Sequence, residues 1–516
     1  MWKRYRATVV SFVIILALVG LMYAGSNATR TASVLLSGLT LASLYFLLAA
    51  GLSLIFGLMD VLNFAHGVLF MIGAYLGYST FGNPRLLLNT LPLLLVLAAG
   101  AAIGALAGQP LRAWEATVRR RAADQSVRGA QGVLLALVSR VSPSFLLALL
   151  AVVLAIWGAR GFPLNRLVAF EGTATGGAVP TVEAQEALAL MFGRLARMAA
   201  AGLLIGPIFA RREEGRRVRA QWPPIVLIVV AAIGGVAMLL ARDPLEGFLL
   251  GLSVNVRFLL ALAVGALSGG LLGVLIETTL IRPFYGNVVT QIVLTLGLSF
   301  VGEELVKAAW GREGRPPMQM PTFFAQSCRS DNLIAWFSEQ CSSVDVLGRA
   351  FPTYRLFIIA VGVFILVGVG VLLRYSRLGM IIRAGVQDSH MVEALGINVR
   401  RVFTLVFALG SALAALGGVI AAPFVGVYPG MGTAFQLQAF IAVVIGGMGS
   451  YPGTAVGVLL LGLARAFGDA LVTGGVTLPW MEQALNASPA VARASTVLIM
   501  AIVLLVRPAG IFGRKE

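Results

Sequence analysis

One short polar stretch between two apolar runs holds residue types that could do chemistry. Asn63 and His66 lie there, and His66 is one of only two histidines in the chain. Asn63 can cap the following helix, which places His66 in its first turn, and Gly67 permits close packing. Polar groups in apolar surroundings are costly unless they have partners or a function. The stretch therefore predicts either a functional polar cluster or a helix cap with tight packing.

A second stretch, from Gly446 to Thr454, is too rich in glycine and proline to form a good helix. At membrane depth, such irregular backbone survives only where protein or a water-filled cavity satisfies its polar groups. The stretch predicts either a pore or gate turn or a hairpin between two helices. The candidate residues are Gly446, Gly447, Gly449, Ser450, Pro452 and Gly453.

A charged segment, residues 374–402, separates two further apolar runs. It predicts a short helix from Met380 to Leu395 that stops at Gly396. Mixed apolar and polar side chains are typical of a helix that docks onto a soluble protein, and a helix lying on lipid headgroups is the alternative. The candidate residues are Gly379, Arg383, Ala384, Asp388, Glu393 and Gly396.

The elements that carry these stretches are membrane spans. Of 516 residues, 59% are hydrophobic and only 12% are charged, whereas soluble domains have about 25% charged residues. An ordinary soluble enzyme is thus nearly excluded, and unbroken apolar runs argue against an outer-membrane barrel. The fold class is all-α, a polytopic transmembrane bundle of roughly 12–14 segments. The expected segments are 8–25, 34–58, 64–80, 87–107, 131–158, 187–210, 223–241, 257–277, 290–309, 356–373, 403–422, 453–471 and 495–507, with 434–448 as a further short piece.

The net charge of +17 has a topological explanation. Basic residues collect in cytoplasmic loops of membrane proteins, so the charge does not require a nucleic-acid partner. If the amino-terminal end is cytoplasmic and successive loops alternate between the two sides of the membrane, the chain crosses fourteen times and both ends are cytoplasmic. The first segment is either an uncleaved anchor or a cleavable signal peptide.

The sequence lacks the motifs of several kinds of enzyme chemistry. The sequence has no P-loop, no convincing metal site and no nucleophile elbow. We therefore expect no enzyme activity, no cofactor and no metal. Cys328 and Cys341 share one polar loop on the predicted outer side, where they form either a disulfide or two free thiols.

These motifs, in this order, resemble the membrane subunit of branched-chain (hydrophobic) amino acid ABC importers; urea and short-chain amide importers are close relatives. The resemblance implies a prokaryotic inner-membrane permease without its own ATPase site. It implies as partners a second homologous permease, two cytoplasmic ATP-binding subunits and an external solute-binding protein. It implies that Asn63, His66 and Gly67, together with the stretch from Gly446 to Gly453, line the translocation pathway. It also places the ATPase-coupling loop at 379–396. The matching stretches are 38–45, 51–53, 63–75, 273–283, 378–401, 446–453 and 507–513.

The chain departs from this family pattern in two places. It has an extra amino-terminal segment, residues 1–33, and an insert with about four spans, residues 81–256. Residues 34–80 and 257–516 then form the two parts of the permease core. Two rival functions stay open. A stand-alone carrier or channel needs ionisable groups in the middle of its spans, and these are scarce here. An intramembrane enzyme or scaffold needs a cluster of reactive residues.

Overall fold

The computed structural model of the chain divides into two compact units. Unit 1 comprises residues 1–81 and 253–516, and unit 2 comprises residues 82–252. The structure describes residues 27–59, 61–82, 85–107, 188–209, 222–387, 389–474 and 510–512, with a few separate positions at 20, between 147 and 157, and between 490 and 505.

Seven helices in the described part of the chain are long and apolar enough to cross a membrane. This finding agrees with a polytopic helical bundle. The predicted spans 8–25, 131–158 and 495–507 lie outside the continuously described residues. The seven stretches are Ala28–Met59, Leu88–Ala105, Val254–Phe284, Val288–Trp310, Thr353–Tyr375, Val399–Val425 and Tyr451–Val472.

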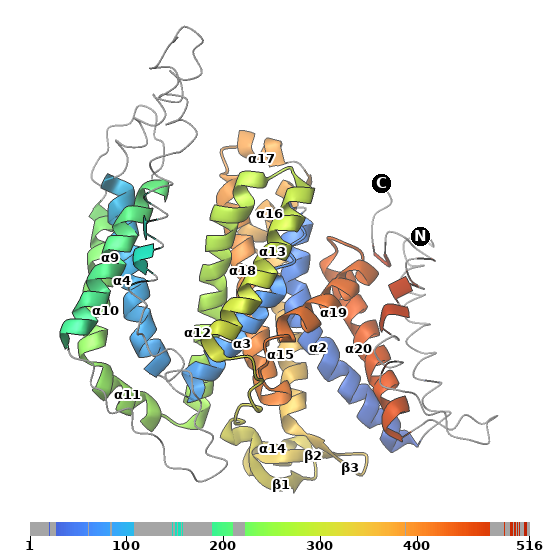
Figure 1. Cartoon of the computed structure of the whole chain (residues 1–516). Helices are drawn as coiled ribbons and strands as arrows, with labels where there is room; N and C mark the ends of the chain where they lie inside the picture. Colours follow the sequence, from blue (N-terminus) through green and yellow to red (C-terminus); the bar gives the residue numbers. More distant parts are fainter. Residues whose placement is uncertain are drawn as a thin grey trace. The chain divides into compact units, whose positions relative to one another are not determined.

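Unit 1 is built around α2 (Ala28–Met59). This helix packs against α15 (Thr353–Tyr375), α18 (Val399–Val425), α19 (Met431–Gly446) and α20 (Tyr451–Gly474), as Figure 1 shows. Its apolar window is 83% buried, against 17% for α15, so α2 forms the core and α15 the periphery.

The remaining spans of unit 1 pack around α18. Helix α12 (Val254–Ile276) lies along α18, and α3 (His66–Gly82) meets α18 where Gly73 touches Ala415. Helix α13 (Val288–Trp310) meets α3 where Gly302 touches Val68. Glycines at the crossings let backbones approach closely, which drives helix association in lipid.

One end of unit 1 carries a feature that an all-α fold does not include. Strands β1 (Gln326–Ser330), β2 (Cys341–Val346) and β3 (Arg349–Pro352) form a sheet in the order β1-β2-β3, parallel and then antiparallel. Helix α14 (Leu333–Glu339) connects the first two strands, and a disulfide joins Cys328 to Cys341. The all-α prediction is therefore wrong for this loop, because short paired strands leave little hydrophobic pattern.

The opposite end of unit 1 carries α16 (Arg377–Gln387) and α17 (Ser389–Ala394), as Figure 1 shows. These two helices replace the single helix predicted from Met380 to Leu395. We call this end of unit 1 the α16 end, and the opposite end the sheet end.

Unit 2 contains α4 (Arg85–Ala107), α9 (Leu188–Phe209), α10 (Trp222–Leu240) and α11 (Arg242–Gly251). Helices α4 and α9 pack through paired glycines, Gly100 and Gly104 on one and Gly202 and Gly206 on the other. A side chain at any of the four would overlap the facing backbone, so close packing here requires glycine.

Candidate functional site

The backbone between α2 and α3 is irregular, yet it lies inside the protein. Asn63 is 1% exposed and His66 is fully buried. Asn63 Oδ1 accepts a hydrogen bond from the Ala65 amide at 3.0 Å, and Gln436 Nε2 of α19 donates to the Asn63 carbonyl at 3.3 Å. Since irregular backbone at membrane depth needs protein partners, these two bonds explain why the stretch is tolerated. The contact between Gln436 and Asn63 cannot be inferred from the sequence, because 373 residues separate them.

The starts of α3 and α19 are in contact beside this stretch. A Cβ atom on Gly432 would lie 2.7 Å from the Gly67 carbonyl oxygen. The two helices have 17 and 16 residues, or about 25 Å each, which is shorter than a bilayer core of about 30 Å. Short helices whose positive N-terminal ends meet within the membrane form the binding sites of many transporters.

Asn63, His66 and Gln436 form what we call the buried polar cluster. Within the described part of the chain, neither ring nitrogen of His66 has a partner with good hydrogen-bond geometry, although the Leu48 backbone lies nearby. Asn63 Nδ2 and Gln436 Oε1 are also unsatisfied there. Each such buried group costs about 1–3 kcal/mol, so the cluster is a candidate site rather than simple core.

His66 lies against Gly51 of α2, at a point where the backbones of α2 and α18 come very close to each other. Gly51 of α2 and Gly410 of α18 face each other, and a Cβ atom on Gly51 would lie 2.7 Å from His66 Nε2. Any larger side chain at Gly51 would displace the imidazole. The position of His66 thus depends on two glycines far apart in the sequence.

The stretch from Gly446 to Gly453 lies apart from this cluster, at the α16 end. Gly447 and Gly449 have φ values of 102° and 79°, which favour glycine, and they make the turn between α19 and α20. Ser450 caps α20, because its Oγ accepts from the Gly453 amide at 3.2 Å. Gly446, Gly447 and Gly453 are buried, whereas Gly449 and Pro452 are exposed. Gly449 lies against Gly57 near the end of α2, whereas the Asn63 stretch contacts Gln436 and Gly432 near the start of α19.

Residues 510–512 complete the end of α19. The Ile511 and Phe512 amides donate to the Ile445 and Gly446 carbonyls at 2.8 and 2.9 Å. These carbonyls belong to the last turn of a helix, where no intrahelical donor remains. We call this contact the tail clip.

The predicted coupling segment forms a bent pair of helices at the α16 end. Arg383 Nη1 donates to the Leu373 carbonyl at 2.6 Å, so it fastens α16 to the end of α15. The close turn before α16 leaves no space for a side chain at Gly379. Gly396 ends α17 with φ of 81°, and the Ile397 amide donates to the Val392 carbonyl as in a glycine helix stop.

The outer surface of this bent pair is mixed in character. Its residues Ala384, Glu393 and Gly396 are exposed, and Asp388 lies outside the described residues. Three exposed apolar side chains lie beside them, 54% to 74% accessible: Met380, Met391 and Leu395. Such a surface can bind a soluble protein or lie on headgroups.

An ion pair between the buried Glu277 and the partly exposed Arg282 links the end of α12 to α18. Glu277 is fully buried at the start of the π-helical turn η1 (Glu277–Ile281), and Arg282 begins the short helix η2 (Arg282–Phe284). The Arg282 guanidinium donates to both Glu277 carboxylate oxygens, at 3.0 and 2.8 Å, and also to Thr404 of α18. Tyr285 donates to Glu277 as well. Burial, followed by this hydrogen bond, raises the pKa of Tyr285, so its hydroxyl remains a donor at neutral pH.

The described residues contain no group of three or more His, Cys, Asp and Glu side chains that could hold a metal ion.

A family model described as the permease component of branched-chain amino acid transport systems matches residues 218–506. The LivH permease of the high-affinity branched-chain amino acid transport system of Escherichia coli K12 is 30% identical over 243 residues, covering 47% of this chain and 70% of LivH. BraD of Pseudomonas aeruginosa, from a system of the same description, is 32% identical over 267 residues, covering 51% and 77%. The fructose import permease FruF of Bifidobacterium longum is 26% identical over 288 residues, covering 53% and 73%. No solved structure matches the chain.

Proposed function

The chain belongs to the family of branched-chain amino acid transport system permease components, and from this premise we propose that it imports branched-chain or other hydrophobic amino acids across a bacterial inner membrane. The observation that carries the proposal is the family match over residues 218–506. ATP hydrolysis then takes place on partner subunits. An external binding protein delivers the substrate, which crosses between this chain and a second permease.

The buried polar cluster supports a pathway role for Asn63, His66 and Gly67. Two helix N-terminal ends meet there, and their partial positive charge suits the carboxylate of an amino acid. The cluster is closed in this conformation, because Asn63 and His66 are buried. Rocking of α3 and α19 against α18 would open it, with the turn at Gly446–Gly453 as the hinge.

The bent pair of α16 and α17 is the proposed contact with the ATP-binding subunits. Its exposed apolar residues offer a docking surface, and Arg383 joins α16 to the spanning helix α15. A push on α16 would therefore move α15 and, through the bonds of Gly396 and Asn398, the start of α18. In this arrangement both ends of the chain are cytoplasmic and the sheet end is external.

A sugar is the second candidate substrate, because the fructose import permease is also similar over 53% of the chain. The test is uptake into vesicles that contain the assembled transporter, with radiolabelled leucine, fructose and urea compared side by side. Leucine uptake that depends on ATP supports the proposal. Uptake of only fructose or urea reassigns the substrate, and leucine uptake without ATP would show a carrier instead.

Coupling is tested with charge reversal at an exposed position. Glu393→Lys should reduce transport by about tenfold or more, while substrate-independent ATPase activity persists. The charge reversal weakens the proposed contact with the ATP-binding subunits, and a loss of about 1.4 kcal/mol there corresponds to a factor of ten. Gly396→Pro should have the same effect, since proline has no N–H to donate to the Glu393 carbonyl and cannot adopt the positive φ at this turn. The matched control is Glu313→Lys, an exposed residue in the loop between α13 and β1. Equal uptake in all three variants contradicts the coupling assignment.

A further inference from the structure

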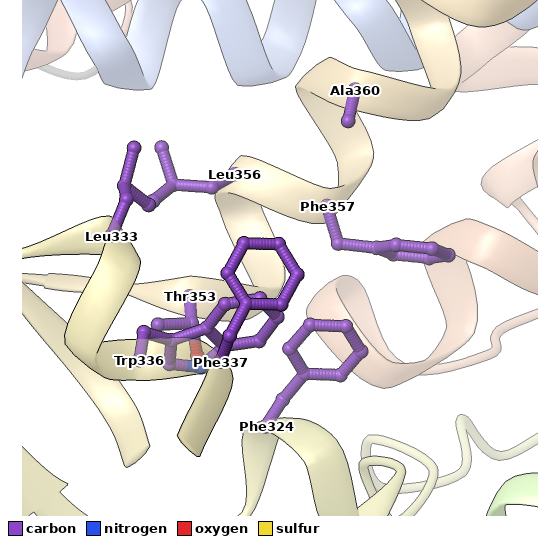
Figure 2. Close-up of a pocket in the computed structure, with 8 residues that line it drawn as sticks. All are labelled: Phe324, Leu333, Trp336, Phe337, Thr353, Leu356, Phe357 and Ala360. Atoms are coloured by element: carbon purple, nitrogen blue, oxygen red, sulfur yellow. The ribbon is translucent and has the colours of Figure 1, made fainter. Parts of the chain in front are cut away.

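The sheet end of unit 1 contains a pocket that shares no residue with the buried polar cluster. Its volume is about 390 Å³, within the range of about 300–1,000 Å³ typical of small-molecule sites. Figure 2 shows Trp336 and Phe337 of α14 lying opposite Leu356, Phe357 and Ala360 of α15, with Phe324 completing the wall. Phe324 stacks on Trp336, with ring centroids 5.6 Å apart. Aromatic side chains therefore make up half of the lining residues, four of eight.

The lining leaves no polar group to recognise a polar ligand. Thr353 Oγ1 donates to the Cys341 carbonyl at 2.9 Å, and Trp336 Nε1 donates to the same carbonyl at 3.0 Å. Cys341 is itself held by the disulfide to Cys328. Because the polar lining groups are paired within the protein, the ligand must be an apolar group.

The pocket is continuous with the lipid-facing side of a membrane span. Its α15 residues, Thr353, Leu356, Phe357 and Ala360, follow a spacing of three, four and seven residues, which puts them on one face. The same face continues along α15 with four exposed apolar side chains, Val363, Phe364, Val367 and Val371. Lipid chains cover such a face of a spanning helix, so the same chains reach the pocket.

Helix α14 exposes large apolar side chains beside the pocket. Ile334 is 85% exposed and Phe337 is 77% exposed, although Trp336 turns inward onto Phe324. Aromatic and apolar side chains next to the end of a span are typical of elements that lie at the membrane surface. Helix α14 thus fits the headgroup layer as a lid on the pocket.

We propose that this pocket binds one acyl chain of a bilayer phospholipid, with α14 lying in the adjoining headgroup layer. The pocket carries no charged lining group, so binding depends on the chain and not on the headgroup. This inference goes beyond transport, and it stands whichever substrate the protein imports.

The experiment uses the assembled transporter in nanodiscs of phosphatidylethanolamine and phosphatidylglycerol. Native mass spectrometry after detergent exchange counts retained lipids, and a phosphatidylglycerol with a diazirine in its acyl chain maps the contact by cross-linking. Ala360→Trp fills the pocket from an exposed position of α15. Gly368→Trp, on the same helix, is the matched control, because a Cβ atom there would have no neighbour within 4 Å.

We expect one tightly held phospholipid and cross-links within residues 333–337 or 353–360. Both signals should fall about tenfold in Ala360→Trp, a loss of ~1.4 kcal/mol of binding, and persist in Gly368→Trp. Equal signals in the two variants would overturn the proposal. The proposal would also be overturned if the cross-links appear with the isolated chain and are absent from the assembled transporter. A partner subunit, and not a lipid, would then occupy the pocket. A retained free fatty acid, told apart by mass, would overturn the phospholipid assignment.

Discussion

At the scale of single residues, the polar cluster shows both what sequence can predict and what it cannot. Asn63 and His66 are visible in the sequence because polar residues are rare between apolar runs. Gln436 is not, because it lies within an apolar helix and its partner is 373 residues away. The glycines that hold His66 are equally hidden, since 60 glycines in the chain give no sign of which ones touch. Whether these residues line the pathway stays a prediction.

Gly51 offers a test of that packing. A glycine-to-alanine change inside a helix normally stabilises it by up to about 1 kcal/mol. Gly51→Ala should instead destabilise the protein by about 1–3 kcal/mol, because the new methyl group overlaps the Gly410 backbone and presses on His66. Detergent-induced unfolding, followed by circular dichroism, measures the change in stability of this variant and of its control.

The matched control for Gly51 is Gly270→Ala on α12. A Cβ atom there would lie 3.5 Å from the Ala408 carbonyl, an ordinary contact. The two variants should therefore shift the unfolding midpoint in opposite directions. Shifts of the same sign and size would show that Gly51 does not limit the packing.

At the scale of elements, hydropathy predicts the described spans to within a few residues. The expected 290–309 is observed as Val288–Trp310, and 403–422 as Val399–Val425. Three local structures escaped prediction for different reasons. The sheet has strands of only four to six residues, the π-helical turn at Glu277 depends on an ion pair between Glu277 and Arg282, and the tail clip joins segments far apart in the chain.

The tail clip makes a prediction about α19. Truncation before Gly510 leaves the Ile445 and Gly446 carbonyls without their donors, and each lost hydrogen bond is worth about 1 kcal/mol. Hydrogen exchange of the amides in the last turn of α19 should become about fivefold faster or more. Truncation that removes only residues 514–516 keeps both donors and should leave the exchange unchanged. Identical exchange in the two truncations would mean that the clip does not stabilise α19.

At the scale of the whole molecule, the family and the helical bundle could be predicted, whereas orientation and domain roles remain predictions. The family could be predicted because several separate motifs occur in the order that is typical of its members. The structure places the disulfide loop and the bent pair of α16 and α17 at opposite ends of α15. If the sheet end is external, the two ends of α15 therefore face different compartments.

Cysteine labelling tests this orientation in intact cells. Disulfides persist in oxidising compartments, so Cys328 and Cys341 should react with a membrane-impermeant maleimide only after external reductant is added. A cysteine placed at exposed Ala394, in a variant lacking the native pair, should react only after the membrane is opened. Labelling of Ala394→Cys in unopened cells would reverse the proposed topology.

Unit 2 interrupts unit 1 in the sequence, and the two borders of that interruption meet in space: the guanidinium carbon of Arg257 lies 5.3 Å from the ring centre of Phe81. The 171 residues of unit 2 (82–252) separate these two side chains in the chain. A ribosome adds about 5–20 residues per second, so ~10–30 s pass between the synthesis of Phe81 and that of its partner. Helix α18 begins only at Val399, so α2 and α3 are synthesised well before the helix that packs against them, and the core of unit 1 can form only after that delay.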